Sequence, residues 1–110
     1  MAQYEKRIKG NFDRLLAHIE IGISQGSVSA SREGGISYEA DGVRCATRVY
    51  ERFSYLGGNR LSLTVTVFGA GEDLYVSAIT SGGSQAVFIK INTFGEEAFM
   101  RKFVEVVEKF

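Results

Sequence analysis

Three stretches in the middle of the chain alternate apolar with polar residues, at residues 43–54, 60–68 and 74–80. A period of two is typical of strands with one buried face. A fourth alternating stretch, residues 85–91, follows the Gly-Gly step at 82–83. Because glycine supplies the positive φ that tight turns require, these stretches predict an antiparallel meander of four strands.

Two segments outside the meander show helical spacing. Asn11 is a candidate N-cap for a helix over residues 12–24, and Thr93 with Glu96 fits a capping box that opens a helix ending at Phe110. Each predicted helix carries its apolar residues on one face. In the first helix they are Phe12, Leu15, Leu16, Ile19 and Ile23; in the second they are Phe99, Phe103, Val106, Val107 and Phe110.

The remaining segments give weaker signals. Residues 4–9 alternate weakly and predict an edge strand before the first helix. Residues 27–40 fit either one hairpin or one strand followed by a loop, and the pattern does not decide between them. Asp41-Gly42 is a strong turn pair before the meander.

The turns fix a register for the meander. If residues 56–58 close the first hairpin, Val49 lies opposite Val65, and the later turns place Val65 opposite Val76 and Val76 opposite Ile89. This register turns apolar residues from all four strands to the face that receives the helices. It also predicts that Glu51 points toward the helices.

These elements predict one α+β domain over residues 1–110, with two layers: an antiparallel curved sheet of about five or six strands and two helices on one face. The order of elements resembles that of the helix-grip folds, which include TATA-binding-protein-like and Bet v 1-like domains. The segments YERFSYLGGNRLSL (50–63) and SAITSGGSQ (77–85) resemble a small family of uncharacterised bacterial proteins. Neither resemblance implies an activity, because fold does not determine function.

Composition narrows the class of protein. Thirteen basic and thirteen acidic residues cancel, which disfavours nucleic acid as a partner and removes one barrier to self-association. No apolar run approaches the length of a membrane span, and no secretory signal precedes the first strand, so we expect a cytoplasmic protein that does not enter a membrane. Cys45 is the single cysteine, which excludes an internal disulfide.

The predicted register leaves one sheet face uncovered by helices. Arginine and tyrosine beside small hydroxyl residues are favoured at protein interfaces, so we expect this face to join two copies of the chain. The alternative is an ordinary solvent-exposed face. The candidate interface residues are Arg48, Tyr50, Arg52, Tyr75, Phe88 and Lys90.

A second candidate site lies at one end of the face beneath the helices. A carboxylate at Glu51 would be costly there unless it were paired, neutral or at an edge that reaches solvent. One alternative is a small-molecule pocket, conceivably an enzyme's; the other is a structural salt bridge, for example with Arg60. The candidate ligand-binding residues are Glu51, Tyr55, Asn59, Arg60, Thr80 and Gln85.

No catalytic, metal-binding or cofactor-binding motif stands out. The only histidine, His18, has no cysteine, histidine or acidic residue at ligand spacing, and its helical position predicts that it points to water. The sequence therefore favours a non-catalytic binding protein without cofactor, a homodimer through the open sheet face, over a small-molecule binder.

Overall fold

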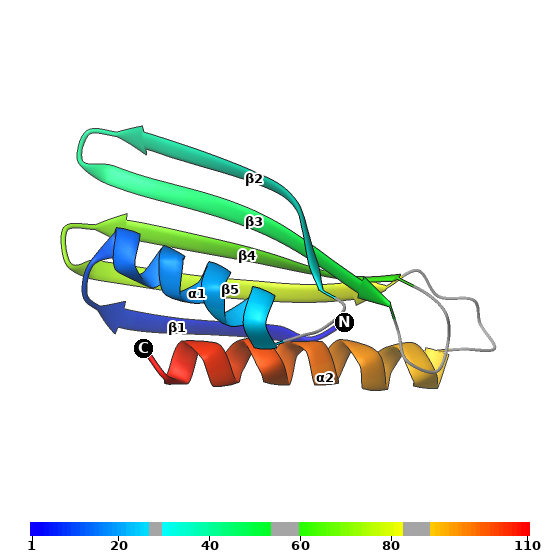
Figure 1. Cartoon of the computed structure of the whole chain (residues 1–110). Helices are drawn as coiled ribbons and strands as arrows, with labels where there is room; N and C mark the ends of the chain where they lie inside the picture. Colours follow the sequence, from blue (N-terminus) through cyan, green and yellow to red (C-terminus); the bar gives the residue numbers. More distant parts are fainter. Residues whose placement is uncertain (27–29, 54–59, 83–88) are drawn as a thin grey trace.

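The computed structural model describes residues 1–26, 30–53, 60–82 and 89–110. They form five strands and two helices, with strand order β1-β5-β4-β3-β2 and every neighbouring pair antiparallel (Figure 1). The α+β class and the antiparallel sheet confirm the prediction, and the helix-grip resemblance stays a prediction. The elements are β1 (Gln3–Lys9), α1 (Phe12–Gly26), β2 (Ser31–Ala40), β3 (Val43–Phe53), β4 (Arg60–Ala70), β5 (Asp73–Gly82) and α2 (Ile89–Glu108).

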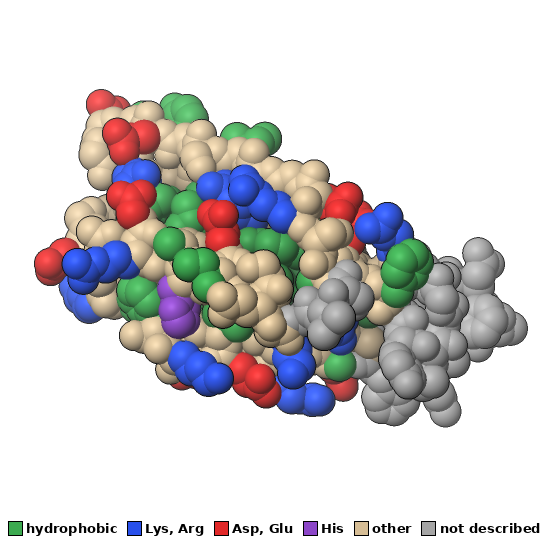
Figure 2. All heavy atoms as spheres, in the orientation of Figure 1, with side chains coloured by type: hydrophobic (Ala, Val, Ile, Leu, Met, Phe, Trp, Pro, Cys, Tyr) green, Lys and Arg blue, Asp and Glu red, His purple; other side chains and the backbone are tan. Residues whose placement is uncertain are grey.

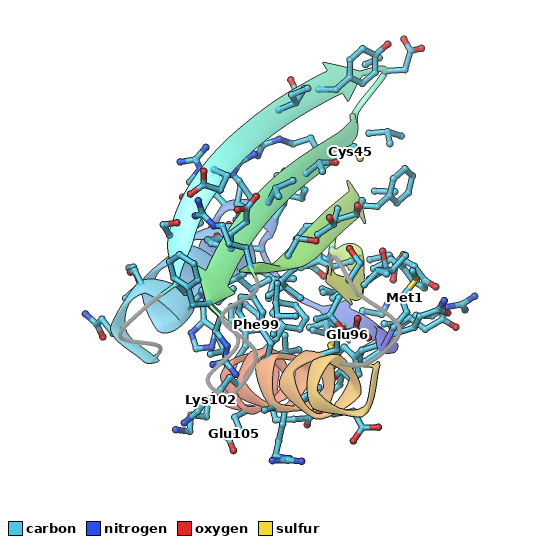
Figure 3. All side chains as sticks on the ribbon, turned by 90° about the vertical axis from the view of Figure 1, so that its right-hand side faces the viewer. Met1, Cys45, Glu96, Phe99, Lys102 and Glu105 are labelled. Carbon is cyan, nitrogen blue, oxygen red and sulfur yellow. The ribbon has the colours of Figure 1, made fainter. Side chains whose placement is uncertain are left out.

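Both helices pack on one face of the sheet, and the core lies between the layers (Figures 1 and 3). Alternate residues of β4 and β5 enter this core, as the period of two predicts. Phe99 of α2 lies between the helix and the sheet, whereas Lys102 and Glu105 point away from it (Figure 3). Side chains that are essentially fully buried include Leu15, Ile19, Leu63, Val65, Val67, Val76, Phe99 and Phe103.

The structure confirms the predicted N-cap of α1 and the predicted turn between β2 and β3. The backbone N–H of Arg14 donates to Oδ1 of Asn11 at 2.9 Å, which makes Asn11 the N-cap. Asp41 and Gly42 have φ of 52° and 79°, the positive values that a two-residue hairpin turn requires. Residues 31–40 form one strand with a bulge between Arg32 and Gly34, so within the described residues the first alternative, a hairpin inside 27–40, is wrong.

The predicted register between β3 and β4 is wrong by one residue. Val49 pairs with Thr64 and not with Val65, whose partner is Arg48. A shift of one residue exchanges the faces of a strand, so the even-numbered residues of β3 point toward the helices. Arg48 is 8% and Tyr50 3% exposed. Glu51, in contrast, belongs to the uncovered face.

The β4–β5 register differs from the prediction by two residues, which preserves the faces. Val65 pairs with Ala78, and Val67 pairs with Val76. Both partners of the predicted Val65–Val76 contact are nevertheless fully buried in the core.

The predicted strand at 85–91 is also wrong where the structure describes it. Residues 89–91 belong to α2, which begins at Ile89, so Thr93 lies inside the helix and does not cap it. Residues 85–88 lie outside the described residues. The place beside β5 is taken by β1, in which Lys6 pairs with Val76, and this confirms the predicted N-terminal strand.

The two helices meet at a close contact. Gly22 of α1 packs against Val106 of α2 so tightly that a Cβ on the glycine would lie 2.4 Å from Cγ1 of Val106. The half-buried His18 donates from Nε2 to the carbonyl of Val106 at 2.6 Å. The prediction that His18 points to water is therefore wrong, because α2 covers it.

Candidate functional sites

The outer face of the sheet has no helix over it among the described residues, and the β2–β3 end of the sheet curves away from both helices (Figure 3). The register places its side chains in rows across the strands. One row is Tyr38, Cys45, Phe68, Tyr75 and Arg7; the next is Ile36, Thr47, Thr66, Ser77 and Glu5. The face is thus rich in aromatic, β-branched and hydroxyl side chains, and in these two rows the charged side chains, Arg7 and Glu5, come from β1.

The edge strand β2 is the most exposed element of the sheet. Nine of its ten residues are exposed, and Ile36 and Tyr38 retain 75% and 68% of their accessible surface. An edge strand presents unpaired N–H and C=O groups that another chain can bind. The exposed apolar pair marks this edge as a candidate contact surface.

On the inner face, a polar cluster joins β2 and β3 to α1. Nε of the buried Arg48 donates to Glu20 at 3.2 Å, and its Nη atoms donate to the carbonyls of Ile36 and Thr47 and to Oγ of Ser37. Arg32 contacts the other Glu20 oxygen at 3.5 Å. Figure 2, which views the molecule from the side of α1, shows basic and acidic side chains adjoining between patches of hydrophobic ones.

Tyr50 lies beside this cluster. Its hydroxyl is buried and has no hydrogen-bond partner among the described residues. Burial, together with the nearby charge of Glu20, raises the pKa of Tyr50 to about 12, against the opposing effect of Arg32 and Arg48. The hydroxyl therefore remains protonated, and a potential donor, at neutral pH.

The predicted ligand-binding residues do not come together. Glu51 lies on the outer face, where Nε of Arg60 contacts its carboxylate at 2.9 Å, so these two residues form the salt bridge that was the structural alternative. Thr80 is fully buried on the opposite face and accepts a hydrogen bond from the N–H of Ala2 at 3.1 Å. Tyr55, Asn59 and Gln85 lie outside the described residues.

The predicted interface residues are also dispersed. Tyr75 lies on the outer face as expected, but Arg48 and Tyr50 are inside, because β3 has the opposite phase. The guanidinium of Arg52 lies 4.8 Å from the centre of the Phe99 ring, on the helix side, and burial lowers the pKa of Arg52. Phe88 is outside the described residues. Lys90 belongs to α2 and not to a strand.

Within the described residues, no group of three or more His, Cys, Asp and Glu side chains could hold a metal ion. Neither of the two described helices combines the length and the apolar character that a membrane span needs. The two faces of the sheet and the β2 edge offer hydrogen-bond donors, exposed apolar side chains and unpaired backbone groups, all of which can bind another molecule.

In a comparison with protein families, a family model matches residues 1–110 of the chain. The chain belongs to the DUF6054 family, a family of unknown function. This agrees with the resemblance seen in the sequence to an uncharacterised family. A comparison with curated proteins gives no match for this DUF6054 chain.

Sequence reasoning missed the residues that define both surfaces of this DUF6054 protein. Ile36 and Tyr38 alternate with Ser37 and Glu39, a signal that was present but stood in a segment with two open interpretations. The ion pairs of Glu20 with Arg32 and Arg48 gave no local signal, because they join a helix to strands that follow it in sequence.

Proposed function

We propose that the protein acts by binding, in the cytoplasm of bacteria, as a homodimer whose two β2 strands pair antiparallel and join the sheets into one. The observation that carries this proposal is the exposure of β2 along nearly its whole length. Strand addition at a free edge is a common mode of recognition, because main-chain hydrogen bonds supply affinity. The balanced charge of the chain supports self-association, and the free thiol of Cys45 is consistent with a reducing compartment.

The hairpin turn determines which backbone groups of β2 are free. In a hairpin closed by two residues, Ala40 and Val43 form a hydrogen-bonded pair, and such pairs alternate along an antiparallel ladder. Tyr38 and Ile36 therefore direct their N–H and C=O groups toward β3. The groups of Gly35, Ser37 and Glu39 point to the open edge.

Side-chain complementarity selects one register for the dimer. A twofold axis at Ser37 pairs the free groups of Ser37 with those of the second copy, and places each Ile36 opposite Tyr38 of the second copy. Pairs of aromatic and β-branched residues stabilise sheets. The same register sets Glu39 opposite Gly35, which carries no side chain. Glu39 is already 3.0 Å from Nε of Arg44 in its own chain, so no unpaired charge faces the second copy.

Size-exclusion chromatography with light scattering, over a range of protein concentrations, tests the dimer. Ile36→Lys places a charge on the contact and is expected to give a monomer. Ile79→Lys is the matched control, because Ile79 is an exposed isoleucine on the same face but on β5, and it should remain dimeric. A monomeric wild-type protein at high concentration would refute the proposal, as would an Ile36→Lys variant that still dimerises.

Disulfide formation tests the register separately. In a Cys45→Ser background, the Ser37→Cys substitution would place one thiol from each copy at the twofold axis, with Cα atoms about 5.5 Å apart, which permits a disulfide. Glu39→Cys is the control, because its two copies would be offset by four residues, on the order of 14 Å. If only Glu39→Cys cross-links, the dimer stands and the register is wrong.

A further inference from the structure

A cleft lies between the C-terminal half of α1 and the start of β2. Its volume is about 280 Å³, near the lower limit for small-molecule sites. Its lining combines polar and apolar side chains. We call it the Tyr50 cleft, and its lining residues are Glu20, Ile21, Ile23, Ser24, Ala30, Arg32 and Tyr50.

The Tyr50 cleft contains a buried donor without an acceptor. Tyr50 is only 3% exposed, and its hydroxyl has no partner among the described residues. A buried polar group is normally satisfied by protein, water or a ligand, so each exception requires an explanation. An acceptor atom of a bound molecule would satisfy this hydroxyl.

The charges around the Tyr50 cleft leave a surplus of one positive charge. Arg32 and Arg48 are both directed to the single carboxylate of Glu20. Arg48 uses its remaining donors on backbone and Ser37, whereas the half-exposed Arg32 has one ion pair, at 3.5 Å, among the described residues. Its planar fork of donors suits a carboxylate. One negative charge would balance the cluster, whereas a dianion would reverse its sign.

The lining of the cleft also contains apolar side chains. Ile21 is 55% exposed although it belongs to a helix whose other large apolar residues are buried, and it lines the cleft together with Ile23 and Ala30. An exposed isoleucine in the same cleft as a donor pair offers one contact for hydrocarbon and another for charge. An amphipathic molecule uses both contacts at once.

We infer that the Tyr50 cleft binds a small organic monoanion, a carboxylate with a short aliphatic body. The carboxylate accepts hydrogen bonds from Tyr50 and Arg32, and the aliphatic body covers Ile21. This site is on the helix side of the sheet and does not depend on the proposed dimer, whose contact is along the free edge of β2.

Titration with hexanoate, followed by ¹H–¹⁵N and methyl NMR spectra of the full chain, tests the inference. The expected result is saturable shifts at Ile21, Arg32 and Tyr50, with much weaker binding of hexanol and of inorganic phosphate. Equal binding of hexanol would refute the charge recognition. Stronger binding of phosphate would refute the choice of a carboxylate, and no saturable shift with hexanoate would refute the site.

Tyr50→Phe removes only the hydroxyl. We expect it to weaken hexanoate binding about ten-fold, since a hydrogen bond to a charged group is lost. Tyr38→Phe is the matched control, because Tyr38 is exposed and on the other face, and it should bind like the wild type. Without ligand, Tyr50→Phe should be at least as stable as the wild type. Unchanged hexanoate binding, or a clear loss of stability without ligand, would show that the hydroxyl serves the fold and would overturn the inference.

Discussion

The contact between the two helices at Gly22 can be tested by adding a single methyl group. A Cβ at this position would lie 2.4 Å from Cγ1 and 2.9 Å from Cγ2 of Val106. Carbon atoms in good contact are separated by about 3.5–4.0 Å, so Gly22→Ala forces the helices apart by roughly 1 Å or distorts the Val106 side chain. Glycine is therefore required here by the closeness of α2.

Two effects of opposite sign determine the magnitude. Overpacking costs about 1–3 kcal/mol, and an overlap with two atoms places Gly22→Ala near the upper value. Alanine regains about 1 kcal/mol of helix propensity. The expected net loss is about 2 kcal/mol, which corresponds to a fall in Tm of roughly 8 °C for a domain of this size.

Thermal and urea unfolding of four proteins measure this coupling: the wild type, Gly22→Ala, Val106→Ala and the double variant. Val106→Ala removes the two atoms closest to the new methyl group, Cγ1 and Cγ2, and leaves Cβ at 3.2 Å, so the double variant should recover most of the loss, with a coupling of about 2 kcal/mol. Gly26→Ala is the control, since a Cβ there would meet no atom within 4 Å from other parts of the described chain, and it should be neutral or slightly stabilising. A Gly22→Ala protein as stable as the wild type, without coupling to Val106, would refute the close approach of the helices.

Two further predictions concern buried polar groups. Arg48→Met should lower the free energy of unfolding by roughly 3 kcal/mol, because it leaves Glu20 and the β2 acceptors without their main donor. Arg44→Met, at an exposed ion pair, should change the free energy of unfolding little. Urea unfolding measures both variants, and equal effects would contradict the structural role given to Arg48. Burial first, then Glu108, raises the pKa of Tyr4 to about 12, as burial does for Tyr50. Above about pH 10 the unfolded chain ionises both hydroxyls whereas the folded protein keeps them neutral, so the free energy of unfolding falls as the pH rises toward 12. Unfolding measured between pH 9 and 12 should show a shallower alkaline loss in Tyr50→Phe than in the wild type, and parallel profiles would contradict the shift.

The alternation was sufficient to predict β4 and β5 because in each strand one phase contains most of the apolar residues: Leu61, Leu63, Val65 and Val67 in β4, and Leu74, Val76 and Ala78 in β5. In β3 both phases contain apolar residues: Val43, Cys45 and Val49 in one, Ala46 and Tyr50 in the other. The phase is decided by Arg48, whose partner Glu20 lies on α1. A local pattern carries no information about a partner that only the folded chain brings near, so the faces of β3, on which both candidate sites were built, were assigned wrongly.

The start of α2 shows a second limit of prediction from the sequence, which is the shortness of the pattern. Ile89 and Ile91 alternate with Lys90 as residues of a strand do, but three residues are too few to separate a period of two from the spacing of a helix. Either the N-terminal strand or residues 85–91 could have paired with the free edge of β5, and in the structure β1 pairs with it. The Tyr50 cleft was beyond prediction, because it exists only where α1 passes the start of β2.

The bulge at Glu33 gives β2 two separate duties. If Glu33 were paired in a regular ladder, Arg32 would lie opposite Glu51, on the side of Ile36 and Tyr38; with Glu33 as the extra residue, Arg32 pairs with Tyr50 and turns toward Glu20. The bulge thus allows one strand to supply Arg32 to the helix side and Ile36 and Tyr38 to the uncovered side. Deleting Glu33 would remove the bulge and leave Arg32 opposite Tyr50, on the same side as before.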